Sequence, residues 1–193
     1  GVTAMKRFVQ SWIVLCVFAL ATSAAADDDK QQQVSAYAAV PLAEILDAVS
    51  KQTGQVFFAS PHVPENVVVG QLKAKDISYS SLLIILYNNE LAAVRVGEVT
   101  NIVHASRIRQ HPLPILREDD DSIPEYEWVS RIFDVKNGPA TRYVPLLRPL
   151  LPQMAHLVAD PASNTVLIVG RYGNTKRLGA LLEAMDKPGP TQN

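Results

Sequence analysis

Cysteine is almost absent from this sequence of 193 residues. Its one cysteine, Cys16, lies in an apolar segment near the start. Without that segment the chain has no thiol, which excludes disulfide bonds and thiolate metal sites. The fold must therefore depend on apolar packing alone. The sequence also lacks a basic excess: without Lys6 and Arg7 it carries 16 basic residues against 19 acidic ones. This balance argues against nucleic acid as a partner.

No apolar run in the sequence is long enough to cross about 30 Å of hydrocarbon comfortably. The longest run, residues 12–21, follows the positive residues Lys6 and Arg7 and precedes the small residues 24–26. This order is typical of a cleaved export signal, which we predict for residues 1–26, with a retained anchor as the alternative. An exported, periplasmic protein is therefore expected.

Motifs that carry chemistry are missing as well. The stretch TVLIVGRYGNTKRL, residues 165–178, has the apolar run, glycine and helical pattern of a dinucleotide-binding unit, but it lacks G-x-G-x-x-G. No phosphate-binding loop and no G-x-S-x-G motif occurs, and Glu44 and Asp47 fall on the polar side of a predicted helix. The histidines show no metal-ligand spacing: His62, His104, His111 and His156. We therefore expect no enzyme, no catalytic or metal-binding residue and no cofactor.

Residues 34–106 predict a first small α+β unit of order β-α-β-β-α-β-β, after a polar and mobile start over 27–33. A short strand over 34–40 leads into an amphipathic helix between Pro41 and Gly54, because apolar residues recur there at helical spacing. Short strands follow, and the serines of SYSSLLIILYNNE begin a second helix. The runs LAAVRV and VTNIVHA, on either side of a glycine-containing turn, predict a hairpin.

Residues 107–125 predict a linker, because they hold three prolines and no sustained periodicity. The acidic run within them, residues 118–121, could hold a hard cation weakly, but a solvated connector is the simpler interpretation.

Residues 126–187 predict a second α+β unit of order β-α-β-β-α, followed by a tail over 188–193. The run ATRYVPLLRPLLP keeps a helical stripe that Pro145 and Pro149 must kink or fray. MAHLVAD and TVLIVG predict a hairpin, and Asn174 can cap the helix that follows. The apolar face of this last helix is predicted to consist of Leu178, Leu181, Leu182 and Met185.

The two units in this order resemble the periplasmic N-terminal domains of bacterial secretins, the outer-membrane channels of type II secretion and type IV pili. The first unit, from PLAEILDAVSKQTGQVFFAS to VTNIVHA, resembles the domain that secretins share with the signalling extensions of TonB-dependent receptors. The second resembles the KH-like repeat that follows it, most clearly in LVADPASNTVLIVGRYGNTKRLGALLEAMD. In that stretch Asp160, Asn164, Thr165 and Asp186 stand where relatives have an acidic residue, Asn-Thr and a final aspartate.

This resemblance implies a structural protein that binds other polypeptides in the periplasm. In the family the first domain meets inner-membrane components and the second packs beside its copies in a ring. Carried over to this sequence, the family's docking role falls on a strand with Val34, Ala36, Tyr37, Ala38 and Val40. The implied subunit-packing residues are Arg142, Arg148, Asp160, Arg171, Arg177 and Glu183. The implied partners are inner-membrane secretion or pilus components, and a full-length secretin or copies of the chain itself, with no nucleic acid and no small-molecule cofactor.

Several interpretations stay open at this point. A full secretin continues into further repeats and a barrel-forming domain, whereas this sequence ends at Asn193, so it is either a truncated secretin or a stand-alone accessory protein. The alternative function is a periplasmic signalling or adaptor module, similar to the N-terminal extension of a TonB-dependent receptor. The KH-like second unit favours the secretion or pilus interpretation. For any single arginine of the packing set, simple solvation is the plainer interpretation.

The division into two units predicts the course of limited proteolysis. We expect the first cut between Arg107 and Glu125, because a connector without a packed core opens more easily than either unit. Two stable fragments should then remain on a gel and by mass spectrometry. A single resistant core spanning 34–187 would contradict the division.

Overall fold

The computed structural model describes residues 39–188. The predicted signal peptide, the polar start and nearly all of the tail lie outside the described residues. Residues 40–68 and those from 72 onward cluster by their contacts into one compact body, which contains a three-stranded sheet in the first predicted unit and a four-stranded sheet in the second.

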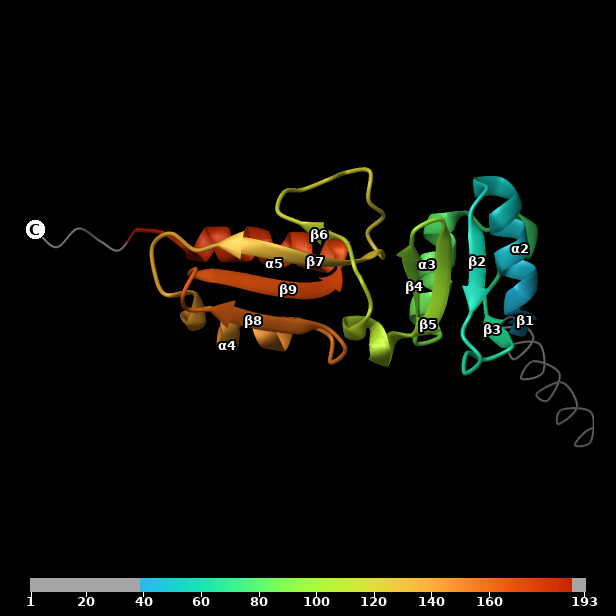
Figure 1. The fold of residues 1–193 in the computed structure, drawn as a ribbon, viewed down its shortest axis with the longest axis horizontal. Helices are drawn as coiled ribbons and strands as arrows, with labels where there is room; N and C mark the ends of the chain where they lie inside the picture. Colours follow the sequence, from blue (N-terminus) through green and yellow to red (C-terminus); the bar gives the residue numbers. More distant parts are fainter. Residues whose placement is uncertain (1–38, 189–193) are drawn as a thin grey trace, which may run out of the picture. The chain divides into compact units, whose positions relative to one another are not determined.

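The three-stranded sheet has the order β2-β5-β4. Strand β2 (Val56–Ala59) pairs in parallel with β5 (Val99–His104), and β4 (Leu91–Val96) pairs with β5 as the predicted antiparallel hairpin. Two further short strands, β1 (Ala39–Pro41) and β3 (Asn66–Val68), form a sheet of their own. The order of helices and strands in the first unit agrees with the predicted β-α-β-β-α-β-β (Figure 1).

Two helices contribute buried side chains to the core of the first unit. Helix α2 (Leu42–Thr53) ends at Gly54, whose φ of 71° is left-handed and whose N–H donates to the carbonyl of Ser50 at 2.8 Å. Glycine adopts this conformation without the steric cost that a Cβ would bring, which is why the helix stops there. Helix α3 (Tyr79–Asn88) is capped by Ser78, whose hydroxyl accepts the N–H of Ser81. The residues that α2 buries are those of the predicted stripe: Leu42, Ile45, Leu46 and Val49.

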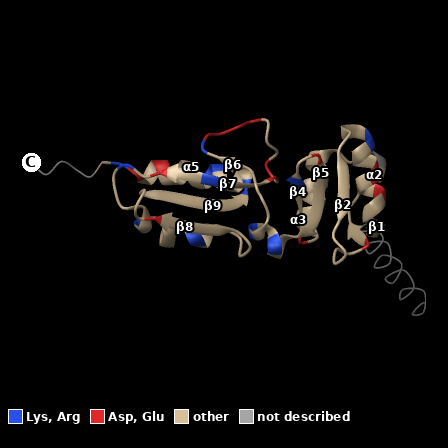
Figure 2. Ribbon diagram, in the orientation of Figure 1, with Lys and Arg blue, Asp and Glu red and all other residues tan. Residues whose placement is uncertain are grey.

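The segment predicted as a plain linker contains more structure than its sequence indicates. The 3₁₀ helix η2 (Ala105–Gln110) is followed by β6 (Ile115–Leu116), which pairs in parallel with β7 (Trp128–Asp134). A parallel pair requires a crossover connection, and residues 117–127, here called the acidic loop, provide it without a helix. Figure 2 shows the acidic residues of this loop as a red stretch between β6 and β7.

Among the contacts that tie the acidic loop to the rest of the chain, three involve its acidic run. Asp119 forms an ion pair with the buried Arg131 at 2.7 Å, and Asp121 forms one with Lys176 at 2.8 Å. The backbone N–H of Asp120 donates to the hydroxyl of Tyr172 at 2.6 Å. The acidic run is therefore held by partners within the chain.

The four-stranded sheet has the order β6-β7-β9-β8, in which β9 (Thr165–Arg171) lies between two antiparallel neighbours, β7 and β8 (His156–Asp160). The segment with Pro145 and Pro149 forms three short pieces in place of one helix, because proline lacks the N–H that a helix interior needs. These pieces are η3 (Ala140–Arg142), α4 (Val144–Leu147) and η4 (Arg148–Leu150). The kinking that the sequence predicts is confirmed.

Helices α4 and α5 (Tyr172–Met185) cover only one face of this sheet, with the strands in front of them in Figure 1. Helix α5 approaches β7 closely: a Cβ placed on Gly179 would lie 2.3 Å from the ring of Phe133. Only glycine permits this approach. Within residues 39–188 no helix combines the length and the apolar character that membrane crossing requires. The buried core between helices and sheet includes Leu147, Leu157, Ile168, Leu178 and Leu182.

The structure gives a physical reason for the residues that resemble the secretin signature. Asn164 has a left-handed φ of 53°, and its side chain accepts the N–H of Ala140 while donating to the carbonyls of Val135 and Gly138. Asp160 folds its own turn by accepting the N–H of Ala162 and the hydroxyl of Ser163. Together they fix the β8–β9 turn and the loop that follows β7.

Asp186 closes the same loop from the end of α5. Its carboxylate accepts the backbone N–H groups of Lys136 at 2.6 Å and Asn137 at 2.9 Å, and the hydroxyl of Tyr143 at 3.1 Å. The Lys136 N–H above all lowers the pKa of Asp186. Because the folded state favours the ionised carboxylate, this contribution to stability is present above the ordinary pKa and is lost as the pH falls through the lowered one.

Two expectations for α5 are wrong in part. The helix begins at Tyr172, so Asn174 is not its cap; the Asn174 side chain accepts a hydrogen bond from Arg177 instead. In the predicted apolar face Leu178 and Leu182 are buried, but Leu181 and Met185 are 37% and 39% exposed. The helix starts earlier because the carbonyls of Glu127 and Glu125 accept the N–H groups of its first residues.

Replacing Asn164 with alanine should destabilise the second unit by about 2–4 kcal/mol, because three hydrogen bonds are lost and alanine is strained at positive φ. Chemical denaturation measures the difference. Asn164→Gly loses the same hydrogen bonds without the strain and should fall between alanine and wild type. Equal denaturation midpoints for Asn164→Ala and wild type would disprove the role of this side chain.

Candidate protein-binding surfaces

Strand β2 is an edge of the three-stranded sheet, so one side of its backbone has no neighbouring strand in that sheet. A groove of about 810 Å³ runs beside it, lined by β2, by α2 and by the turn that follows β2. Unpaired backbone groups along an edge are a template for an added strand, and an adjoining groove can accept the side chains of that strand.

Apolar side chains surround this edge. Val56, Phe58 and Val96 are 49%, 58% and 46% exposed. The register of the sheet places them on the face of Val94 and Val103, opposite the face that α2 and α3 cover. Large exposed apolar side chains that share one face mark an interaction site. We call Val56, Phe58 and Val96 the edge patch.

In the described part of the chain, the four-stranded sheet also has one face without helices. Ile132, Leu167 and Val158 lie in one row across β7, β9 and β8 on the face opposite α4 and α5. Val158 is 42% exposed, and Ile115 of β6 is 70% exposed next to Ser130 on the same face. We call this surface the open face. On the helical side of the unit, other large apolar residues are exposed: Leu146, Leu150, Leu181 and Met185.

Most of the predicted docking strand lies outside the described residues, namely Val34, Ala36, Tyr37 and Ala38. Val40 is described: it is half-buried in β1, which pairs with β3. The docking role given to these residues stays a prediction.

The predicted packing residues differ in what they contact within the chain. Arg148 donates to the carbonyl of Ala155 at 3.0 Å, and Asp160 is used in its own turn. Arg142 is exposed beside the ring of Tyr143. Glu183 is exposed and makes no hydrogen bond or ion pair with another described side chain. Their packing role also stays a prediction.

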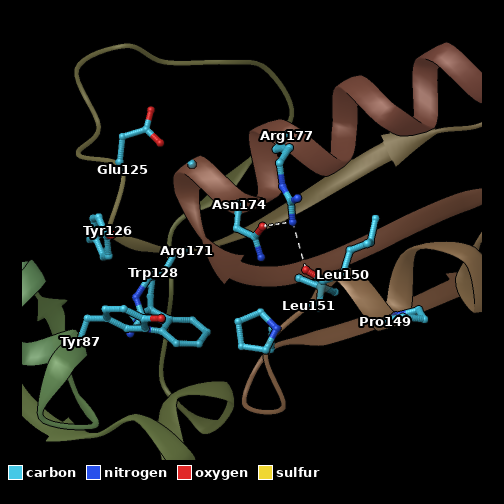
Figure 3. Close-up of a pocket in the computed structure, with 13 residues that line it drawn as sticks. Tyr87, Glu125, Tyr126, Trp128, Pro149, Leu150, Leu151, Arg171, Asn174 and Arg177 are labelled. Atoms are coloured by element: carbon cyan, nitrogen blue, oxygen red, sulfur yellow. Dashed lines mark hydrogen bonds between the residues drawn. The ribbon is translucent and has the colours of Figure 1, made fainter.

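Two of the predicted arginines, Arg171 and Arg177, line a single pocket of about 590 Å³. The guanidinium of Arg171 lies over three aromatic rings, 4.0 Å from the centre of Tyr87, 5.0 Å from Trp128 and 5.9 Å from Tyr126. Arg177 donates to the carbonyl of Leu150 and to Asn174 (Figure 3). The sequence contains no local pattern that could have identified this aromatic cluster, because its members come from distant segments.

A half-buried acid lies next to this cluster in the sequence. The hydroxyl of Tyr79 donates to the carboxylate of Glu127 at 2.8 Å, and this hydrogen bond joins α3 to the start of β7. Burial raises the pKa of Glu127, although the hydrogen bond from Tyr79 opposes the shift. Burial also raises the pKa of Tyr79.

Among residues 39–188 no group of three or more His, Cys, Asp or Glu side chains is arranged to hold a metal ion. The surfaces described above offer edges, apolar faces and aromatic stacking, which are means of binding proteins.

Comparison with known proteins finds similarity to secretins. No family model matches it. The secretin XcpQ of Pseudomonas aeruginosa is 28% identical over 149 residues, which are 76% of this chain and 22% of XcpQ. The secretin GspD 2 of Escherichia coli is 25% identical over 95 residues, which are 48% of this chain and 14% of that protein.

The chain is homologous to secretin N-terminal domains. It spans about a fifth of the length of XcpQ. Its fold agrees with that of a chain in the Klebsiella pneumoniae type II secretion outer-membrane complex of PulD, PulS and the PulC HR domain. The TM-score is 0.64 at 22% identity, over 80% of this chain and 27% of that one. The predicted resemblance to secretin N-terminal domains is therefore confirmed.

The raised pKa of Glu127 predicts a pH-dependent effect of removing its charge. A carboxylate whose pKa is raised by folding stabilises the fold below its ordinary value of 4.5, and this contribution is lost as the pH rises through the raised pKa. Glu127→Gln keeps an acceptor for Tyr79 without the buried charge. Its melting temperature should therefore exceed that of the wild type at pH 7, and the difference should shrink towards pH 4.

Thermal unfolding followed by circular dichroism across that pH range measures this. Glu98→Gln in the exposed hairpin turn is the matched control and should show no such trend. A Glu127→Gln variant that is less stable than the wild type at pH 7 would show that the carboxylate charge is favourable at this site.

Proposed function

We propose that the chain is a periplasmic structural component of a secretin-based secretion machine of the type II kind, which docks an inner-membrane component and packs against neighbouring subunits. Its homology to secretins is the observation that carries this proposal. The Klebsiella protein PulD, from a complex whose chain shares this fold, was solved together with PulS and with the HR domain of PulC. We propose for this chain a partner like the HR domain of PulC.

Docking takes place at the edge of β2. The partner adds a strand to β2, and its alternate side chains contact the edge patch on one face and the groove beside α2 on the other. Main-chain hydrogen bonds supply affinity in this mode, and the exposed Phe58 and Val56 supply specificity through apolar contact.

Packing between subunits takes place through the second unit. The open face of one copy covers exposed leucines on the helical side of the next, such as Leu146 and Leu181. Such a contact joins two different surfaces, so repeating it gives a ring when the rotation closes. Each contact is modest, and isolated copies associate weakly, whereas many copies held together gain avidity.

The two surfaces can be separated by experiment. A photo-crosslinking amino acid at Val56, introduced into cells that contain the secretion machine, should capture the inner-membrane partner. Phe58→Glu in the same chain should remove at least about 90% of that adduct, because a charge on the edge opposes strand addition. Val158→Glu should leave the adduct intact and abolish the concentration-dependent increase in sedimentation coefficient of the purified chain.

Each variant is the matched control for the other, since both place a glutamate on an exposed strand position. An adduct that survives Phe58→Glu would refute docking at β2. Self-association that survives Val158→Glu would refute packing through the open face.

A further inference from the structure

The guanidinium of Arg171 is half-buried and has no anionic partner among the described residues. Its contacts are the rings of Tyr87, Trp128 and Tyr126. Burial lowers the pKa of Arg171, and no carboxylate offsets this effect. A cation that is partly withdrawn from water without an anionic partner loses hydration, so an anion that reached it would restore a charged hydrogen-bond acceptor.

The pocket around Arg171 has an apolar wall as well as a charged group. Figure 3 shows the aromatic residues and Arg171 on one side of it, and Leu150, Leu151 and Pro149 on the other. Its volume of about 590 Å³ falls in the range of ligand-binding clefts. An apolar wall of leucine and proline suits an aliphatic side chain.

The polar groups of the pocket favour an anionic ligand. Arg177 is a second guanidinium at its rim, and within residues 39–188 its hydrogen bonds go to the carbonyl of Leu150 and the amide oxygen of Asn174. Glu125 is the one carboxylate among the pocket residues, which leaves an excess of positive charge. The buried indole N–H of Trp128 also lacks a hydrogen-bond partner among the described residues.

We propose that this pocket binds a short peptide segment of a partner protein in which an Asp or Glu stands next to a leucine-sized apolar residue. The carboxylate pairs with the fork of Arg171, which the aromatic rings hold flat and oriented. The apolar side chain lies against Leu150 and Leu151. A peptide fits better than a free anion, because an inorganic anion would leave the apolar wall exposed to water.

None of the residues of the edge patch or of the row across the second sheet lines this binding site, although the register places Arg171 and Trp128 at the end of the same sheet face as that row. Its wall residue Leu150 also belongs to the exposed helical side, so the site is independent of the proposed docking at β2 but adjoins the surfaces proposed for packing.

The test uses two synthetic peptides and the full chain labelled with ¹⁵N. The probes are N-acetyl-Ala-Leu-Asp-Ala-amide and its Asn counterpart, titrated while the indole N–H signal of Trp128 is followed by NMR. The Asp peptide should bind at least about tenfold more tightly than the Asn peptide, because hydrogen bonds to a charged acceptor are the stronger ones. Added salt should weaken only the Asp peptide.

Variants locate the site. Arg171→Gln should remove the preference for Asp, whereas the matched control Arg142→Gln, an exposed arginine outside the pocket, should keep it. Leu150→Ser, at a 42% exposed position, should weaken both peptides alike without affecting the fold. Circular dichroism confirms that each variant is folded.

Three outcomes would overturn the proposal. These are equal affinities of the two peptides for the wild type, an undiminished Asp preference in folded Arg171→Gln, and no change of the Trp128 signal at about 10 mM peptide, where even a weak site would fill.

Discussion

Incomplete coverage of the second face of each sheet is the constraint on which this structure depends. Each of the two larger sheets has its α-helices on one side. On the other side of the three-stranded sheet, η2 and Trp128 bury Val94 and Val103 but leave the edge at β2 exposed. No disulfide compensates for the apolar surface that stays uncovered. The chain tolerates this exposure at Val56 and Phe58 on one sheet and at Ile115 and Val158 on the other. Such surfaces lower the free energy of a protein most when another polypeptide covers them. The same architecture that limits the stability of the single chain thus suits it to assembly.

The signature that links the chain to secretins has a structural explanation that needs no partner. Asn164 lies in the β8–β9 turn and Asp186 at the end of α5, and both hold the loop that follows β7. Asp160 shapes the turn that brings Asn164 into position. These polar residues do the work that a disulfide often does in a small exported domain, by joining segments far apart in the sequence.

Periodic segments were predictable from the sequence because their pattern is local. The stripe of α2, the stop at Gly54 and the interruptions at Pro145 and Pro149 all follow from residues within one or two turns. The start of α5 was not predictable from the sequence. The first N–H groups of this helix donate to carbonyls of the acidic loop, so no side-chain cap marks its beginning. The two-residue strand β6 is likewise too short to leave a pattern.

The candidate sites were less accessible to sequence reasoning than the fold. Arg171 was singled out, but its significance comes from Tyr87 and Trp128, which only the tertiary structure brings beside it. The edge patch could not be predicted, because the sequence of an apolar strand such as VFFA does not show which of its side chains stay exposed. Local patterns report which face of an element is apolar, and they do not report which apolar face is left uncovered.

The acidic loop has a mechanical consequence. Strand β6 contributes only two residues to its sheet, so tension along the chain would detach it before any longer strand. Release of residues 117–127 would then also require the loss of both ion pairs, of the Asp120–Tyr172 hydrogen bond and of the hydrogen bonds that the start of α5 donates to the loop. At about 3.5 Å per residue that segment extends to roughly 38 Å. These contacts thus keep the loop folded against the chain, and their loss would lengthen the connection between β6 and β7 while β7, β9 and β8 keep their longer pairings.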